Sequence, residues 1–141
     1  MTTTSPTTPS SPPTAAVVER WLEWWHTGDV AIADALYAEG YQRHSTDSGT
    51  AGVGVLKGLV AMYLRAFPDL HFAVEDTLVR DDRVAVRWTA TGTHRGEAMG
   101  LPATGRAIEL GGCDILRIQG DRISESWSFY DRAALLEQLR D

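Results

Sequence analysis

Asp114 is the residue whose type and surroundings most directly suggest acid–base chemistry. It lies between Cys113 and Ile115, in a segment that otherwise has the apolar pattern of a buried strand. An ionised carboxylate without a partner is costly there, so Asp114 needs a counter-charge or a proton. Either burial keeps it neutral, as a donor to a developing enolate, or Arg87 holds it ionised. An ordinary salt bridge or exposure at a sheet edge is the alternative.

His44 is the candidate proton acceptor. It ends the motif Tyr41-Gln-Arg-His, where the chain is expected to pass from a helix into a loop. Such junctions commonly hold functional side chains, and histidine changes its charge near neutral pH. A lone histidine is more often a surface or capping residue, so its role depends on its combination with Asp114.

Arg87 lies on the polar side of an alternating segment. Residues 84, 86, 88 and 90 of this segment are apolar, and Ala85, Arg87, Thr89 and Thr91 alternate with them. This alternation is typical of a strand with one buried face. The polar face is either solvated or lines a polar cavity, in which case Arg87 pairs with an anion.

Sequence motifs for metal, phosphate or covalent chemistry are absent. The four histidines are far apart and show no recurring ligand spacing, so we predict no metal site. There is no glycine-rich phosphate loop and no Gly-x-Ser-x-Gly turn. The single cysteine, Cys113, excludes an internal disulfide and fits a reducing compartment.

Composition narrows the class of protein. The chain has 141 residues, of which 43% are hydrophobic and 23% charged, which is typical of one globular domain. Its net charge of -6 disfavours nucleic acid and anionic membrane surfaces as partners. No apolar run approaches the ~20 residues of a membrane span, and no signal peptide is apparent. We therefore expect a soluble, cytoplasmic protein.

The first half of the chain predicts helices. Residues 1–14 contain only Met, Thr, Ser, Pro and are expected to be a disordered tail, and the domain spans 15–141. A helical pattern runs from Ala15 to Gly28, and a second begins at Asp29 and includes Tyr37. A loop containing His44 leads to a third helix, which is ended by Pro68.

The second half predicts strands, at approximately 71–79, 83–93, 106–118 and 122–130, followed by a helix capped by Asp131. Helices followed by a meander indicate an α+β fold, with a curved, mostly antiparallel sheet wrapped over three N-terminal helices. Gly111 and Gly112, in mid-strand, suggest a bulge or bend. Such a sheet forms a cone with a central pocket.

Several motifs together resemble those of the SnoaL-like polyketide cyclases. They are Phe67-Pro-Asp-Leu70, the segment from Asp82 to Gly96, Gly100-Leu-Pro-Ala-Thr-Gly105, and Asp114-Ile-Leu-Arg-Ile118 with Ile123-Ser-Glu-Ser-Trp127. The resemblance covers about residues 15–141. It implies the cone-shaped fold of the nuclear transport factor 2-like superfamily, in which homodimers are common.

The resemblance also implies an activity. These cyclases close a ring in a polyketide ester by an intramolecular aldol reaction, without cofactor or metal, using an acid and a base. Their principal aspartate follows the position that matches Trp127, and here that position is Ser128. Serine does not replace a carboxylate in proton transfer at neutral pH.

Similarity to a more distant relative, ketosteroid isomerase, implies roles for individual residues. Asp114 matches its neutral acid, His44 lies at or one residue from its general base, and Trp21 matches a pocket tyrosine. The same register directs Ser126, Ser128 and Tyr130 inward. The Asp-Arg-Asp set of the similar limonene epoxide hydrolases is incomplete here, so epoxide hydrolysis is not expected.

We therefore expect an enzyme of secondary metabolism that cyclises or isomerises a small, hydrophobic, carbonyl-containing substrate. His44 and Asp114 are its expected catalytic residues. The residues expected to contact substrate are Trp21, Met62, Arg87, Ser126, Ser128 and Tyr130. The alternative is a non-catalytic binding or dimerisation protein on the same fold, which the serine at position 128 favours.

Overall fold

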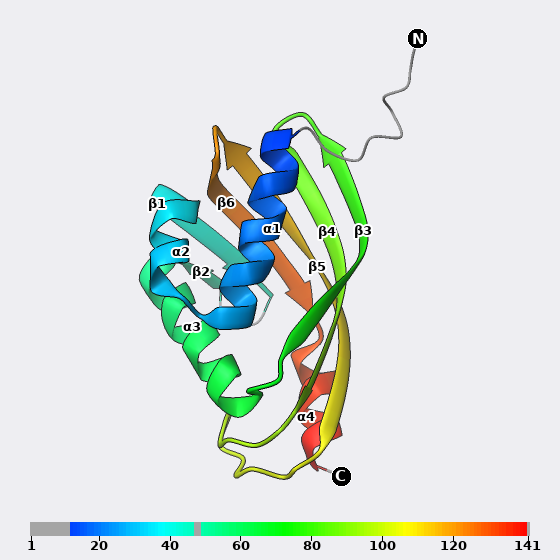
Figure 1. Ribbon diagram of the computed structural model, residues 1–141. Coiled ribbons are helices and arrows are strands. Elements are labelled where there is room, and N and C mark those ends of the chain that lie inside the picture. Colours follow the sequence, from blue (N-terminus) through cyan, green and yellow to red (C-terminus); the bar gives the residue numbers. More distant parts are fainter. Residues whose placement is uncertain (1–11, 47–48, 141) are drawn as a thin grey trace.

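The computed structural model describes residues 12–46 and 49–140 and has an α+β architecture (Figure 1). Three helices come first, interrupted by two strands, and a four-stranded meander and a last helix follow. The elements in chain order are α1 (Pro12–Thr27), α2 (Val30–Leu36), β1 (Tyr37–Ser45), β2 (Gly49–Ala51), α3 (Val53–Ala66), β3 (His71–Arg80), β4 (Arg83–Thr93), β5 (Ala107–Gln119), β6 (Arg122–Tyr130) and α4 (Arg132–Arg140).

All six strands belong to one curved sheet, in the order β2-β1-β6-β5-β4-β3. Every neighbouring pair is antiparallel except β1 and β6, which run parallel. The helix α1 crosses the concave face of the sheet, and α2 and α3 lie beside it (Figure 1). The predicted fold, a mostly antiparallel sheet curved over three N-terminal helices, is therefore confirmed.

The helix boundaries follow local signals in the sequence. Gly28 has a φ of 69°, a left-handed conformation that ends α1, and the Asp29 side chain caps α2 through the amide of Ala31. α3 ends directly before Phe67 and Pro68. α1 begins at Pro12, three residues inside the predicted tail, since proline is tolerated in a first helical turn. The rest of that tail, residues 1–11, lies outside the described residues.

The prediction was wrong for the residues after α2. We expected the second helix to include Tyr37 and a loop to contain His44, but residues 37–45 form β1 and residues 49–51 form β2. Gly40 has a φ of 80°, and the pairing of β1 with β6 shifts between Tyr37 and Gln42. This irregularity and the polar composition of the strand hid its alternation.

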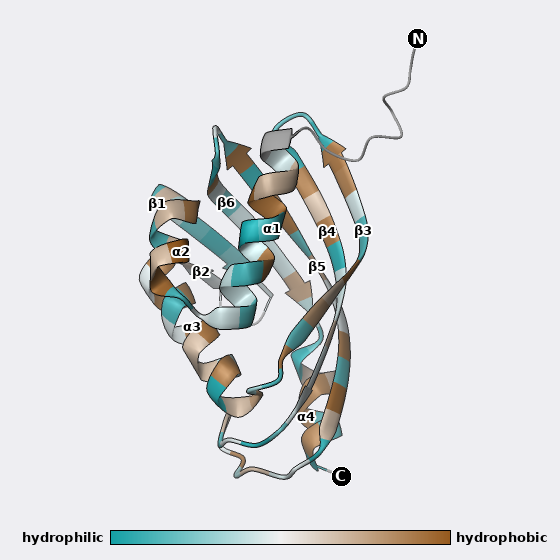
Figure 2. Cartoon of the chain, viewed as in Figure 1, coloured by the Kyte–Doolittle hydropathy of each residue, from teal (hydrophilic) through white to brown (hydrophobic). Residues whose placement is uncertain are grey.

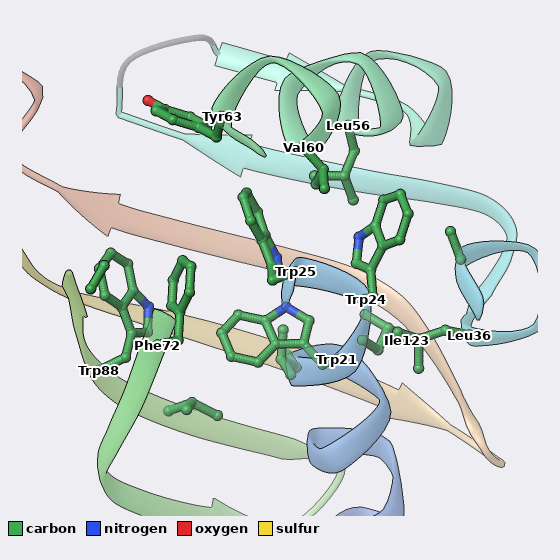
Figure 3. Packing of buried hydrophobic residues seen from close by; sticks show 14 of the residues in the cluster. Trp21, Trp24, Trp25, Leu36, Leu56, Val60, Tyr63, Phe72, Trp88 and Ile123 are labelled. Atoms are coloured by element: carbon green, nitrogen blue, oxygen red, sulfur yellow. The ribbon is translucent and has the colours of Figure 1, made fainter. Parts of the chain in front are cut away.

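The concave face of the sheet is apolar and holds the core. Along β4, buried Val84, Val86, Trp88 and Ala90 alternate with more exposed residues. Figure 2 shows bands of hydrophobic and hydrophilic residues along the strands of the sheet. Tryptophans from α1 fill the space beneath. Trp24 lies near Leu36 and Ile123, whereas the rings of Trp21, Trp25, Phe72 and Trp88 gather on the other side of the helix (Figure 3).

Gly112 provides space for the Trp88 ring. The pairing of β4 with β5 is continuous from Thr89 opposite Gly111 to Trp88 opposite Gly112, so the expected bulge at these glycines is absent from the ladder. A Cβ atom on Gly112 would lie 2.3 Å from the Trp88 ring and 2.8 Å from the carbonyl oxygen of Phe129. Only glycine fits at this point of β5.

We predict that Gly112→Ala destabilises the fold by about 1–3 kcal/mol, because the added methyl overlaps with a buried ring and with backbone. Urea denaturation measures the change. Gly111→Ala is the matched control, since its Cβ would meet nothing closer than the Trp88 carbonyl oxygen at 4.0 Å. Equal stabilities of the two variants would contradict this interpretation of Gly112.

Candidate functional site

A narrow pocket opens between α1, α3 and the concave face of the sheet. It contains about 540 Å³ of space outside protein atoms, counting the part that is continuous with solvent. Most of its lining side chains are aromatic or aliphatic, which suits an apolar ligand. Its lining residues are Trp21, Trp25, Arg43, Tyr63, Phe67, Leu70, Phe72, Trp88, Ala90, Ile108, Leu110, Asp114, Ser128, Tyr130 and Leu135.

Asp114 contributes a buried carboxylate to this pocket. The side chain is inward-facing on β5 and the residue is 5% exposed. Its Oδ1 atom accepts hydrogen bonds from the Trp88 indole at 3.0 Å and from the Ser128 hydroxyl at 3.1 Å. Within the described part of the chain, Oδ2 accepts none. The carboxylate is therefore held through Oδ1 by side chains from both neighbouring strands.

Burial makes Asp114 an acid of intermediate strength. Desolvation raises the pKa of its carboxyl to about 6, although hydrogen bonds from Trp88 and Ser128 and the positive charge of Arg43 favour the ionised form. A carboxyl with this pKa is mostly ionised at neutral pH yet holds a proton firmly enough to return it. These are the requirements for a group that removes and then returns a proton.

Arg43 brings a positive charge into the same pocket. It lies on β1, is 5% exposed and pairs in register with Ser126, so the two side chains share the concave face. Arginine keeps its charge in proteins, and a buried guanidinium interacts strongly with anionic oxygens. Among its lining residues the pocket thus combines a carboxylate, that of Asp114, with a cation, that of Arg43.

Two tyrosines form a second polar group in the pocket wall. The Tyr63 hydroxyl, from α3, lies 2.9 Å from the Tyr130 hydroxyl, from the end of β6. Both residues line the pocket. The pair thus connects α3 to β6.

The structure does not bring His44 to Asp114. His44 pairs with Trp127 across β1 and β6, on the convex face of the sheet, and its ring stacks on that indole at 5.5 Å. Its Nε2 atom lies 2.6 Å from a carboxylate oxygen of Glu125, and its Nδ1 atom lies 2.9 Å from the Thr50 hydroxyl. The geometry therefore does not support His44 as the base for a ligand in this pocket.

The other expected site residues divide into two groups. Trp21, Ser128 and Tyr130 line the pocket. Ser126 faces inward but is engaged by the Tyr41 hydroxyl, and Met62 packs against the core, so neither is part of the pocket lining. Arg87 is on the convex face, where it is more than half exposed and forms an ion pair with Asp76 at 2.7 Å.

Sequence reasoning missed Arg43 and Tyr63 as site residues. Arg43 lies two residues after buried Tyr41 and on the same face of β1, but this pattern becomes visible only if residues 37–45 are recognised as a strand. Tyr63 belongs to the apolar pattern of α3 and carries no mark that distinguishes it from a core residue. The role of Trp88 follows from its place opposite Gly112, which the sequence suggested as a bulge.

Residues 12–46 and 49–140 contain neither a metal-binding cluster nor a membrane-spanning helix. No group of three or more His, Cys, Asp or Glu side chains in this part of the chain is arranged to hold a metal ion. None of its helices has the length and apolar composition needed to cross a membrane.

Solved structures with the same fold come from several bacteria. AclR of Streptomyces galilaeus, a candidate hydroxylase, is 28% identical, with 92% of this chain and 82% of AclR covered and a TM-score of 0.81. IdmH of Streptomyces antibioticus, a candidate polyketide cyclase, is 28% identical, with 92% and 99% covered and a TM-score of 0.80. A candidate polyketide cyclase of Acidithiobacillus ferrooxidans is 27% identical, with 92% and 96% covered and a TM-score of 0.81.

A comparison of the sequence with models of protein families assigns the chain to one family. No curated protein matches the chain. The sequence profile of the SnoaL-like polyketide cyclases matches residues 15–139, which is nearly all of the folded part. This match, the cone-shaped fold and the pocket beneath the sheet agree with one another, and the chain belongs to the SnoaL-like polyketide cyclase family.

Proposed function

We propose that the protein catalyses carbanion chemistry next to a carbonyl group, of the aldol type by which polyketide rings close, and that Asp114 is its acid–base residue. The observation that carries this proposal is the Asp114 carboxylate, buried in an aromatic pocket with Oδ1 held by Trp88 and Ser128. The proposal needs no cofactor, because a carboxylate and a fixed cation supply the required charges.

The reaction begins with proton transfer to Asp114. The ionised carboxylate takes a proton from the carbon beside a substrate carbonyl, and the electron pair of that C–H bond moves onto the carbonyl oxygen as an enolate. The enolate carbon then attacks a second carbonyl, a C–C bond forms, and the second oxygen becomes an alkoxide. The alkoxide takes the proton from Asp114, which restores the carboxylate and balances the step.

Arg43 stabilises the negative charge that develops. In a pocket that excludes water, a guanidinium interacts with an enolate oxygen more strongly than it would in solvent. The same cation favours the ionised form of Asp114 before the reaction. Arg43 therefore assists both the start of the proton transfer and its product.

The serine at position 128 is compatible with this chemistry. The resemblance places the family's aspartate at that position, on β6, and Ser128 pairs directly with Asp114 on β5. A carboxylate thus enters the pocket at the same level of the sheet from the neighbouring strand. Ser128 supplies a hydrogen bond to it in place of the missing acid.

We predict that the protein accelerates exchange of the α-protons of 1-tetralone, a flat bicyclic ketone, in heavy water, as followed by proton NMR. Exchange reports enolisation directly and does not require the natural substrate. Asp114→Asn lowers the enzyme-dependent rate by about 10²-fold or more, since the carboxamide cannot accept the proton.

His44→Asn is the control for this experiment, because it alters a histidine outside the pocket, and it keeps the wild-type rate. Loss of exchange in His44→Asn with retention in Asp114→Asn would transfer the role of base to the histidine. Binding of the ketone without any exchange by the wild type would instead support the alternative of a non-catalytic binding protein.

We predict that Asp114 makes the fold less stable as the pH rises through the acid range. Its folded pKa, about 6, lies above the unfolded value of 3.8, so between these pH values the folded state holds a proton that the unfolded state has lost. Wild-type stability falls over this window and the loss is complete above it. The free energy of unfolding of Asp114→Asn therefore increases relative to wild type by about 3 kcal/mol between about pH 4 and pH 6.

Urea denaturation at a series of pH values measures this difference. Subtracting the free energy of unfolding of wild type from that of Asp114→Asn cancels the pH dependence that other titratable groups contribute to both. Ser128→Ala provides an independent check. It removes a hydrogen bond that favours the ionised carboxylate, so the upper end of the window moves to higher pH. A stability difference between wild type and Asp114→Asn that stays constant across the window would contradict the raised pKa.

A further inference from the structure

Strand register gives the position of the lining residues along the length of the pocket. Ile108 and Asp114 both line the pocket from β5 and are six residues apart, so their backbone positions are separated by roughly 20 Å. Arg43 on β1 pairs with Ser126, which in turn pairs with Leu116. The backbone of Arg43 is therefore still further from Ile108 than that of Asp114, and both charged lining residues come from one end of the pocket.

The lining changes from polar to apolar along β5. At the level of Asp114, the neighbour on β6 is Ser128. At the next level, Trp88 and Tyr130 pair with Gly112 from its two sides. The lining residues of the sheet and of the segment after α3 at the levels beyond are all apolar. They are Phe67, Leu70, Phe72, Ala90, Ile108 and Leu110. The pocket therefore has a charged end and an apolar end.

The C-terminal helix α4 forms a wall of the apolar end. The pairing of β5 with β6 begins at Gly112, opposite Tyr130, where β6 ends. Before that point the Gln138 side chain takes the place of a strand. Its Oε1 atom accepts a hydrogen bond from the Glu109 amide at 2.8 Å, and its Nε2 atom donates one to the Glu109 carbonyl oxygen at 2.9 Å. These bonds hold α4 against β5, and Leu135 of the same helix lines the pocket.

The chemistry of the apolar end selects a hydrocarbon. A substrate oxygen placed among these side chains would lose its hydrogen bonds to water and gain none from them, which is costly. A saturated chain loses no hydrogen bonds there, and each methylene that leaves water contributes to binding. The apolar end therefore fits a part of the ligand that carries no oxygen.

We propose that the apolar end of the pocket binds an alkyl chain of the substrate, and that Leu135 on α4 limits the length of that chain. This inference rests on the proposed function, in which the reacting carbonyl lies at the charged end beside Asp114. It specifies the substrate as a compound with its reacting carbonyl group at one end and a saturated hydrocarbon chain at the other.

Two leucines of α4 offer a matched pair of variants. Leu135 and Leu139 are both buried, 2% and 1% exposed, and lie one turn apart, but Leu139 is not part of the pocket lining. Leu135→Ala therefore lengthens the apolar end, whereas Leu139→Ala removes the same atoms from the same helix outside the pocket. Ala90→Leu is a third variant, which shortens the apolar end by adding atoms to its wall.

The test uses isothermal titration calorimetry with the unbranched methyl ketones 2-hexanone, 2-octanone, 2-decanone and 2-dodecanone. The wild type is expected to bind about two- to fourfold more tightly for each added methylene, until the chain reaches Leu135 and longer chains gain nothing further. Leu135→Ala extends the increase to longer chains, and Leu139→Ala ends it at the wild-type length. Ala90→Leu ends it at a shorter length.

Affinities of the wild type that do not depend on chain length overturn the inference, and so does a limiting length that is the same in Leu135→Ala and Leu139→Ala. If circular dichroism shows that Leu135→Ala does not fold, Ala90→Leu decides, and a limiting length equal to that of the wild type overturns the inference.

Exchange of the α-protons of the same ketones in heavy water tests the proposed function separately. Binding that depends on chain length without any exchange overturns the proposed function and leaves the alkyl site. Exchange with affinities that do not depend on chain length overturns the alkyl site and leaves the proposed function.

Discussion

The structure depends on one energetically unfavourable feature, a carboxylate buried in the apolar concave face of a curved sheet. A charge is expensive in such surroundings, and it persists only where hydrogen bonds and a counter-charge offset the loss of water. Asp114 has hydrogen bonds from Trp88 and Ser128 on the two neighbouring strands, and Arg43 is the cation that acts on it. The balance leaves its pKa at about 6, between that of an ordinary carboxyl and that of a permanently neutral one.

The surrounding fold meets this requirement through the register of four strands. β4 supplies the indole, β5 the carboxylate, β6 the hydroxyl and β1 the cation, and a shift of one residue in any of them would turn that side chain to the convex face. Gly112 completes the arrangement, because its missing side chain leaves space for the Trp88 ring next to β5. The site is therefore a property of the sheet as a whole.

The sequence predicted those parts of the fold that short-range signals encode. Proline, glycine and capping aspartate mark the ends of the helices, and clear alternation marks the strands of the meander, so their limits agree closely with the structure. β1 was not predicted as a strand, because Gly40 and the shift in its pairing with β6 interrupt the alternation of buried and exposed residues. Missing this strand also led to the wrong site residue, because the face that a strand turns inward decides which of two adjacent side chains enters the pocket.

Arg43 and His44 illustrate this consequence. They are adjacent in the sequence and equally plausible by residue type, yet one lies in the pocket and the other contacts Glu125 on the convex face. Which of the two side chains faces the pocket is determined by the pairing of β1 with β6, which is distant in the sequence, and no local sequence pattern indicates it. Asp114 could be identified from the sequence alone, because a charged residue within an apolar strand is energetically unfavourable whatever the rest of the fold is.

The most direct test of the account is a pH titration of the Asp114 carboxyl carbon by NMR, in protein labelled with ¹³C-aspartate and assigned by comparison with Asp114→Asn. We expect one aspartate resonance that titrates with a midpoint of about 6 and is missing from the variant. A midpoint near 3.8, the value of an ordinary aspartate, would show a carboxylate that holds no proton near neutral pH and would contradict the role given to Asp114.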